Sequence, residues 1–168
     1  MMRSNVKIGA TAVSPKEAQK FAEDSYRKGF FCCEAVMETM KEIFKLDVSD
    51  QTIAMASAMS IGAGRSGCMC GALNGAILAL GMFFGRTEPR GPKDPEVNQV
   101  MALSNELHNW FRDNNGKHAV CCRVLTREFD MGKGEHREQC IRLTGLAAYK
   151  LTEIIAREME LTNLDEVA

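Results

Sequence analysis

The sequence of 168 residues has no excess of charge of either sign. Lys and Arg together number 21 and Asp and Glu number 22, so the formal net charge is −1. A nucleic-acid-binding protein usually presents a basic field, and here no block of like charge forms an interaction tail either. We therefore expect no nucleic acid among the partners of this chain.

The chain also lacks the pattern of β-strands. No stretch alternates apolar and polar residues for long, and β-branched residues are scattered. Apolar residues instead recur at intervals of three and four, as on one face of a helix, within residues 15–28, 32–44, 51–59, 96–111, 120–129 and from about 135 onward. With 45% hydrophobic residues, the chain is long enough to bury one core. The sequence predicts an all-α, single-domain bundle of about six to seven helices.

Prolines are scarce, and three of the four lie within residues 88–95. Because proline cannot continue a helix, this stretch predicts an exposed connection. It does not divide the chain into two domains, since either half alone would form a marginal core. We therefore treat 1–168 as one helical domain. Residues 1–13 precede the first helix signal, Ser14 followed by Pro15, and are expected to be a flexible segment.

No secretory signal is visible at the start of the chain. The first residues carry charge, but no apolar run follows them, so we expect a cytoplasmic protein. The seven cysteines are an odd number in a chain without an export signal. We expect these thiols to be reduced, metal-bound or transiently oxidised rather than locked in a structural disulfide framework.

One segment, Ser66–Gly85, contains no charged residue and is flanked by Arg65 and Arg86. Its length suits a membrane span, and its glycines, Gly71 and Gly75 among them, are spaced as in helices that touch within membranes. Its five glycines and Asn74 make it only borderline apolar, which favours a buried helix at the centre of the bundle. We expect no membrane association, and a homodimer through this helix is left open.

The stretch Gly62–Gly67 matches the glycine spacing G-x-G-x-x-G of a dinucleotide-binding loop. That function requires a buried strand before the loop and a βαβ unit around it. Residues 51–61 are rich in Ala and Met and read as helix, so the glycines are better explained by a tight meeting of two helices. The next helix would begin near Cys70, where the helix dipole is expected to lower the pKa of the thiol.

Four cysteines lie in contexts that together form a recognisable signature. Cys32 lies in Gly29–Val36, Cys70 opens Cys70–Ile77, and two further cysteines follow at Cys122 and Cys140. These motifs resemble the redox-active protein family named for its cysteine pattern, C_GCAxxG_C_C, over about residues 21–155. The resemblance implies a small helical protein whose signature cysteines, Cys32, Cys70, Cys122 and Cys140, take part in redox chemistry or hold an iron–sulfur centre. A similar domain is found in split-Soret cytochromes.

The resemblance also sorts the remaining candidates. Gly71 and Gly75 of the second motif are candidate cofactor-contacting positions. The cysteines outside the signature, Cys33, Cys68 and Cys121, are expected to be small apolar core residues. The chain lacks the C-x-x-C-H attachment sequence, so we expect no covalent haem.

Two histidines each precede a signature cysteine by four residues, His118 before Cys122 and His136 before Cys140. On a helix, this spacing puts imidazole and thiol on one face, where both can bind one metal or the histidine can stabilise a thiolate. The alternative is that both histidines lie on the surface and that their spacing from the cysteines is a coincidence. His108 has no such partner and is expected on the surface or in packing.

Thiols from different helices can meet in a bundle, because helix axes lie about 8–10 Å apart and side chains close the gap. Four thiolates suit an iron–sulfur cluster or tetrahedral zinc, whereas two suit a reversible disulfide. We expect a redox or electron-transfer protein that could be oxidoreductase-like, with a redox partner that the sequence does not identify. The alternatives are a binding module with structural zinc and a helical scaffold with inert core thiols.

Overall fold

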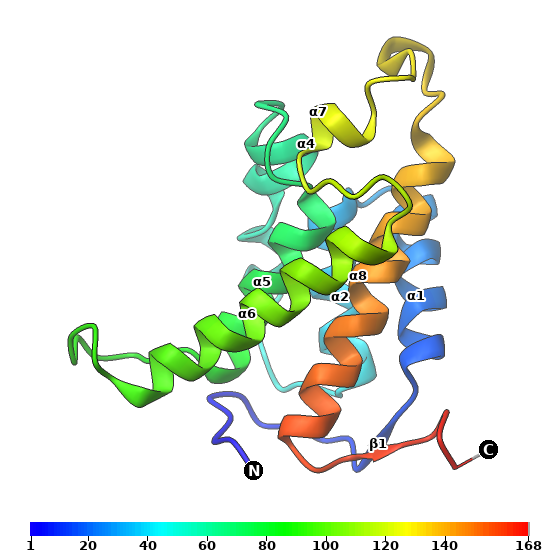
Figure 1. The fold of residues 1–168 in the computed structure, drawn as a ribbon. Helices are drawn as coiled ribbons and strands as arrows, with labels where there is room; N and C mark the ends of the chain where they lie inside the picture. Colours follow the sequence, from blue (N-terminus) through cyan, green and yellow to red (C-terminus); the bar gives the residue numbers. More distant parts are fainter. Residues whose placement is uncertain (168) are drawn as a thin grey trace.

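The computed structural model describes residues 1–167 as a bundle of helices (Figure 1), which confirms the predicted all-α class. The long helices are α1 (Pro15–Lys28), α2 (Cys32–Ile43), α5 (Gly71–Phe84), α6 (Pro95–Asn114) and α8 (Arg137–Glu158). The short helices are α3 (Gln51–Ala54), α4 (Ser60–Ala63) and α7 (Cys122–Leu125), with single 3₁₀ turns at Ser57–Met59 and Met131–Lys133.

Local sequence signals explain where several helices begin and end. The Ser14 hydroxyl accepts a hydrogen bond from the Glu17 N–H at 3.1 Å, and Pro15 occupies the first helical position of α1. Asp94 caps α6 in the same way through the N–H of Glu96. Gly29 ends α1 with φ +127°, a conformation that a residue with a Cβ rarely adopts.

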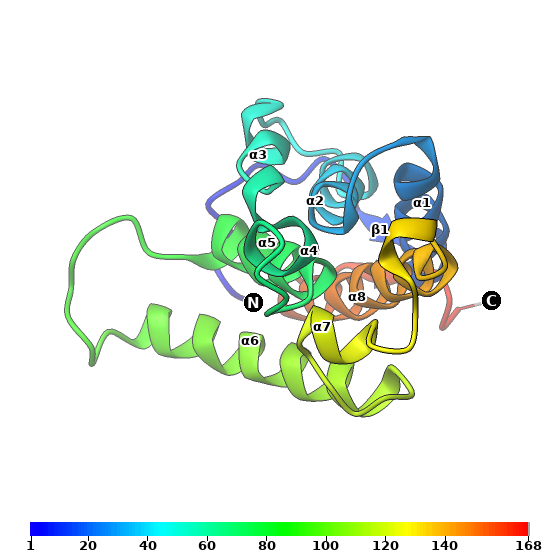
Figure 2. The ribbon, with the colours of Figure 1, turned by 90° about the horizontal axis from the view of Figure 1, so that it is seen from above.

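Helix α5 is the predicted central helix. It lies among α2, α6 and α8 and contacts each of them (Figure 2). Its residues Leu73, Leu80 and Phe83 have no exposed surface. A Cβ on Gly75 would lie 2.7 Å from the carbonyl oxygen of Cys33, so the backbones of α2 and α5 touch there. Among residues 1–167, no helix is long and apolar enough to cross a membrane.

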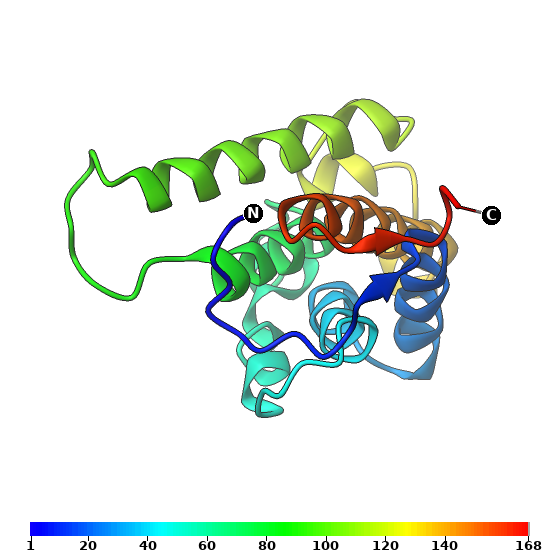
Figure 3. The ribbon, with the colours of Figure 1, turned by 90° about the horizontal axis from the view of Figure 1, so that it is seen from below.

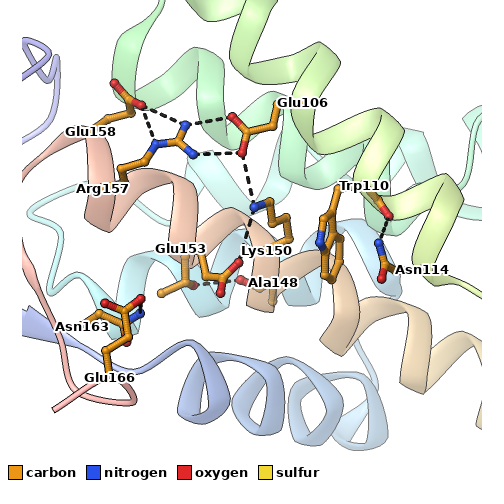
Figure 4. A network of polar contacts seen from close by, with 11 residues as sticks. Glu106, Trp110, Asn114, Ala148, Lys150, Glu153, Arg157, Glu158, Asn163 and Glu166 are labelled. Atoms are coloured by element: carbon orange, nitrogen blue, oxygen red, sulfur yellow. Dashed lines mark hydrogen bonds and ion pairs between the residues drawn. The ribbon is translucent and has the colours of Figure 1, made fainter.

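Helices α6 and α8 are joined by a network of ion pairs at one side of the bundle (Figure 4). The two terminal guanidinium nitrogens of Arg157, Nη1 and Nη2, donate to the Glu106 carboxylate at 2.9 and 2.8 Å. Lys150 lies 3.3 Å from the same carboxylate and 5.7 Å from the centre of the Trp110 ring. This network connects two elements that are distant in the sequence.

The proline-containing stretch, residues 88–95, forms most of the loop between α5 and α6, as predicted. Between α5 and α6 the chain swings away from the bundle before α6 returns along it (Figures 2 and 3). The arginines of this loop pair with Asp94, whose side chain is 2% exposed. Both flanking helices pack into the same core, α5 through Leu80 and α6 through Leu107.

Two expected helices are shorter than predicted. The helix expected over residues 51–59 is divided into α3 and a 3₁₀ turn at Ser57–Met59. The expected break at the glycines that follow is present, since Ile61 and Gly62 have φ of +55° and +66°. The helix expected over residues 120–129 is reduced to α7. Periodicity alone could not reveal that these two helices are short, because their lengths depend on how the chain folds back against α5 and α7.

The first 13 residues, whose expected flexibility stays a prediction, make backbone contacts with the bundle. The N–H of Met2 donates to the Glu158 carbonyl at 2.9 Å, and the N–H of Asn5 donates to the Phe83 carbonyl at 2.7 Å. Residues Ala12–Val13 (β1) pair in parallel with Thr162–Asn163 (β2), as Figure 3 shows from below. This short pairing is a strand element that the sequence pattern did not predict, because its partner lies at the other end of the chain.

Candidate functional site

The four signature cysteines line one cavity of about 40 Å³. Cys32 is the first residue of α2, Cys70 directly precedes α5, Cys122 begins α7, and Cys140 lies in the first turn of α8. Helices α2, α5 and α8 run in the same direction, so their first residues meet at the end of the bundle where α4 and α7 lie (Figure 1). We call this space the thiol cavity.

The thiol cavity is largely shielded from solvent. Cys70 is 6% exposed and Cys122 is 9% exposed, whereas Cys32 and Cys140 are half-buried. Its other lining residues are mainly apolar or aromatic: Tyr26, Phe31, Ile61, Gly71, Met131, His136 and Leu143. Thiols in such surroundings lose hydration, which disfavours the charged form.

The pKa of Cys70 is shifted opposite to the expected direction. Burial raises the pKa of this thiol to about 11, although hydrogen bonds with the backbone of Ala72 and Leu73 at the start of α5 act to lower it. The predicted effect of the helix start is therefore present, but desolvation outweighs it. The sequence located Cys70 beside the helix start and could not show that the thiol is buried.

The other signature thiols are also held in the neutral form. Burial, followed by the Cys70 and Cys122 thiols, raises the pKa of Cys140 to about 12. A hydrogen bond with Cys33, followed by burial, raises the pKa of Cys32 well above its usual range. Burial also raises the pKa of Cys122. In the absence of a cation, the cavity disfavours the presence of several thiolates.

The two candidate glycines have different surroundings. A Cβ on Gly71 would overlap the Sγ atom of Cys32, so the absence of a side chain leaves room beside a signature thiol. Gly75 is not among the residues that line the thiol cavity. It packs instead against the backbone of Cys33, which explains its small size by helix packing.

The two candidate histidines also differ. His136 precedes the first residue of α8 and lines the thiol cavity with Cys140, and its Nδ1 atom is buried without a hydrogen-bond partner. His118 is exposed and has φ +49°, outside α7. The assumption that His118 and Cys122 share a helix face is wrong. His108, half-buried on α6, lies beside Asn109 in hydrogen-bonding distance.

The cysteines outside the signature differ in their bonding. Cys33 is a buried core residue, as expected, and its thiol donates to the Ala56 carbonyl at 2.9 Å. Cys68 and Cys121 form a disulfide, which corrects the expectation of small core residues. They are 53 residues apart in the sequence, so only the meeting of two loops brings them together.

Tyr26 is a cavity residue that sequence reasoning missed. It belongs to α1 and lines the thiol cavity, and burial followed by the Cys140 and Cys32 thiols raises its pKa far above the usual range. Its phenol therefore stays protonated and can donate a hydrogen bond. The only sequence signal was its place in the apolar stripe of α1, which marks packing rather than chemistry.

The glycines of residues 62–67 close a tight loop rather than a dinucleotide site. A Cβ on Gly62 would overlap the backbone nitrogen of Cys68, and the N–H of Gly67 donates to the Gly62 carbonyl at 3.0 Å. The elements that lead into this loop, α3, the 3₁₀ turn at Ser57–Met59 and α4, are helical, so the buried strand of a βαβ unit is not present there.

The thiol cavity contains the types of donor atom that bind soft metals. Thiolates and imidazole are preferred ligands of iron and zinc, and the buried Nδ1 of His136 has no partner within the protein. Within residues 1–167, no three His, Cys, Asp or Glu side chains are already gathered closely enough to hold a metal ion. Loading would therefore require the thiols to move closer together.

Comparison with known proteins gives consistent matches. The model of the family described as "Putative redox-active protein (C_GCAxxG_C_C)" matches residues 30–154. The chain is 25% identical over 179 residues to the split-Soret cytochrome c of Desulfovibrio desulfuricans, covering 88% of this chain but 60% of that protein. A solved structure of that cytochrome, described as having a novel iron centre, matches with a TM-score of 0.65 and 25% identity. That match covers 89% of this chain and 70% of the cytochrome chain.

These matches extend over most of the chain, including the segments that contain the signature cysteines. The family match extends from just before Cys32 to beyond Cys140, and so includes every signature cysteine. By this match, the chain belongs to the C_GCAxxG_C_C redox-active protein family.

Proposed function

We propose that this chain is an electron-transfer protein whose thiol cavity holds an iron-containing centre, with the four signature cysteines as ligands. The observation that carries the proposal is the convergence of these cysteines, from four separate helical elements, on one cavity. The expected cytoplasmic location, the redox partner and the lack of nucleic-acid binding stay predictions.

The surroundings of the cavity support an anionic sulfur site around a cation. A bound cation displaces the thiol protons, so the raised pKa values of Cys70 and Cys140 do not oppose ligation once metal is present. The amino-terminal ends of α2, α5 and α8 face the cavity, and their positive dipole ends favour thiolates there. An iron–sulfur centre would supply one-electron chemistry, and the apolar lining would limit contact with water.

The comparisons favour iron over zinc. The family is described as redox-active, and the related cytochrome is described as having an iron centre. Zinc has no redox chemistry and would make the site structural. The chain covers less than two thirds of the length of the cytochrome, so the activity of that whole protein is not assigned to this chain.

Metal analysis under anaerobic conditions tests the proposal. We expect iron and acid-labile sulfide in the purified protein, with visible absorption that dithionite bleaches. Cys70→Ser should lose both, whereas His118→Ala, a change at an exposed residue outside the cavity, should retain them. Stoichiometric zinc in a redox-silent protein, or a folded protein that takes up no iron under reconstitution, would overturn the proposal.

Thiol–disulfide exchange within the cavity is the second candidate function. The observation that favours it is proximity: the thiols of Cys70 and Cys122 both contribute to the raised pKa of Cys140. The same preparations distinguish the two functions. A metal-free protein whose cavity cysteines interconvert between thiol and disulfide would support exchange and exclude the iron centre.

A further inference from the structure

Two loops meet beside the thiol cavity, residues 67–70 and residues 120–123. The N–H of Arg123 donates to the Gly67 carbonyl at 2.9 Å, and the N–H of Cys70 donates to the Val120 carbonyl at 2.7 Å. Between these two hydrogen bonds, the Cys68–Cys121 disulfide joins the loops, with a Cα–Cα distance of 4.2 Å. We call this arrangement the paired loops.

The disulfide differs from the other cysteines in its access to solvent. Cys68 is exposed and Cys121 is half-buried, whereas Cys33 has no exposed surface and Cys70 is 6% exposed. Exchange begins when a thiolate attacks a disulfide sulfur, so access largely decides which disulfides react. Among the cysteines, Cys68 is the one most open to a molecule approaching from solution.

The paired loops are held by contacts other than the disulfide. Gly67 has φ +82°, and a Cβ there would lie 3.1 Å from the Cβ of Arg123, so glycine allows the loops to approach closely. On the other side, the backbone of Gly62 packs against that of Gly67 and Cys68. These contacts and the two backbone hydrogen bonds can keep the cysteines near each other after reduction. Re-formation of the bond then requires little loop-closure entropy.

We propose that Cys68 and Cys121 form a thiol–disulfide exchange site for an external dithiol, separate from the thiol cavity. One thiolate of the dithiol attacks the sulfur of Cys68, forming a mixed disulfide and releasing Cys121 as a thiolate that takes up a proton. The second thiolate of the dithiol then attacks the other sulfur of the same dithiol, which is bonded to Cys68 in the mixed disulfide, and Cys68 leaves as a thiolate. Two electrons pass to the protein, and the dithiol becomes a disulfide.

The position of Arg123 supports this chemistry. The Cβ, Cγ and Cδ atoms of this residue lie against Gly67, so Arg123 brings a positive charge to the paired loops, and positive charge favours the thiolate form of a nearby cysteine. The site is also adjacent to the thiol cavity in the sequence, because Cys68 lies two residues before Cys70 and Cys121 directly before Cys122. The exchange site does not depend on metal in the cavity, so its test is independent of the test of the proposed function.

Alkylation and peptide mass spectrometry test the site on the full-length folded protein. After treatment with oxidised dithiothreitol, we expect a cross-link between tryptic peptides 66–86 and 118–123. Reduced dithiothreitol should remove it under native conditions, while Cys33 stays unmodified until denaturation. A cross-link that never forms, or one that yields to reductant only after denaturation, would overturn the proposal.

Each of these peptides contains a second cysteine, so variants must assign the bond. The cross-link should persist in Cys70→Ser combined with Cys122→Ser and be lost in Cys68→Ser. The converse result would place the bond between cavity cysteines and refute the exchange site. A circular dichroism spectrum with native helix content shows that each variant is folded.

Two variants, each retaining one cysteine of the pair, identify which sulfur the dithiol attacks. In Cys121→Ser, the free Cys68 should react with 5,5'-dithiobis(2-nitrobenzoic acid) faster than Cys121 does in Cys68→Ser, because Cys68 is more exposed. A faster reaction at Cys121 would refute the proposed attack on Cys68.

Discussion

Gly71 lies directly against the sulfur of Cys32, so closely that a Cβ atom on residue 71 would overlap Sγ. The residue that begins α5 thus sets the space available to a thiol at the beginning of α2. The CG pair of the second motif is thereby explained by two functions: Cys70 supplies a thiol, and Gly71 leaves room for another.

The substitution Gly71→Ala tests this contact. The added methyl group must displace the Cys32 thiol, so we expect a loss of about 1–3 kcal/mol in the free energy of unfolding and a loss of bound iron. Gly81→Ala is the control in the same helix, since its Cβ would meet no atom within 4 Å. It should instead gain about 0.5–1 kcal/mol from helix propensity. Urea unfolding and iron analysis measure both, and equal effects at the two positions would contradict the contact.

The histidines provide a second matched pair. His136 lines the thiol cavity with a buried, unpartnered Nδ1 atom, whereas His118 is exposed outside α7. We expect His136→Ala to change the visible spectrum or the reduction potential of the reconstituted protein, and His118→Ala to leave both unchanged. If His118→Ala had the larger effect, the assignment from the cavity lining would be wrong.

The Glu106 network predicts a specific dependence of stability on pH. Hydrogen bonds from Arg157, together with Lys150, hold the pKa of the Glu106 carboxyl below its usual range. A lowered folded-state pKa contributes stability above the unfolded-state value of about 4.3, and this contribution is lost as the pH falls through the folded-state pKa. Glu106→Gln should therefore cost about 0.5–1 kcal/mol at pH 7 and progressively less toward pH 3.

The control for this network is Glu88→Gln. Glu88 is 74% exposed and lies 3.9 Å from Arg90, so its removal should leave stability nearly unchanged at both pH values. Urea titrations of the three proteins at pH 7 and pH 3 give the comparison. A cost for Glu106→Gln that does not decrease in acid would contradict the role of the ion pairs in Figure 4.

The raised pKa values of the cavity thiols predict how the reduced, metal-free protein reacts. Burial and neighbouring thiols raise the pKa of half-buried Cys140 to about 12. Only its thiolate is nucleophilic, so its alkylation by iodoacetamide should be slow at pH 7 and accelerate about tenfold per pH unit through pH 9. A cysteine in a short peptide, with a pKa of about 8.5, should level off in this range. A plateau for Cys140 below pH 9 would contradict the shielding of this thiol from water.

Some features of the protein follow from short stretches of sequence. Ser14 with Pro15 marks the beginning of α1, the spacing of apolar residues predicts α2, α6 and α8, and the prolines of residues 88–95 predict the loop. The cysteine motifs identified the family and singled out the four signature cysteines. These features depend on hydrogen bonds, caps and side-chain periodicity within a few residues, which the local sequence determines.

Other features were decided only by the tertiary structure. Burial raised the pKa of Cys70 where the helix start alone predicted a decrease. The meeting of two loops joined Cys68 to Cys121, and helix placement brought His136 but not His118 to the thiol cavity. Each of these outcomes depends on contacts between residues that are far apart in the chain. The sequence by itself determined the long helices and the signature thiols, and the packing of those helices determined which thiols meet, which are buried and which are bonded.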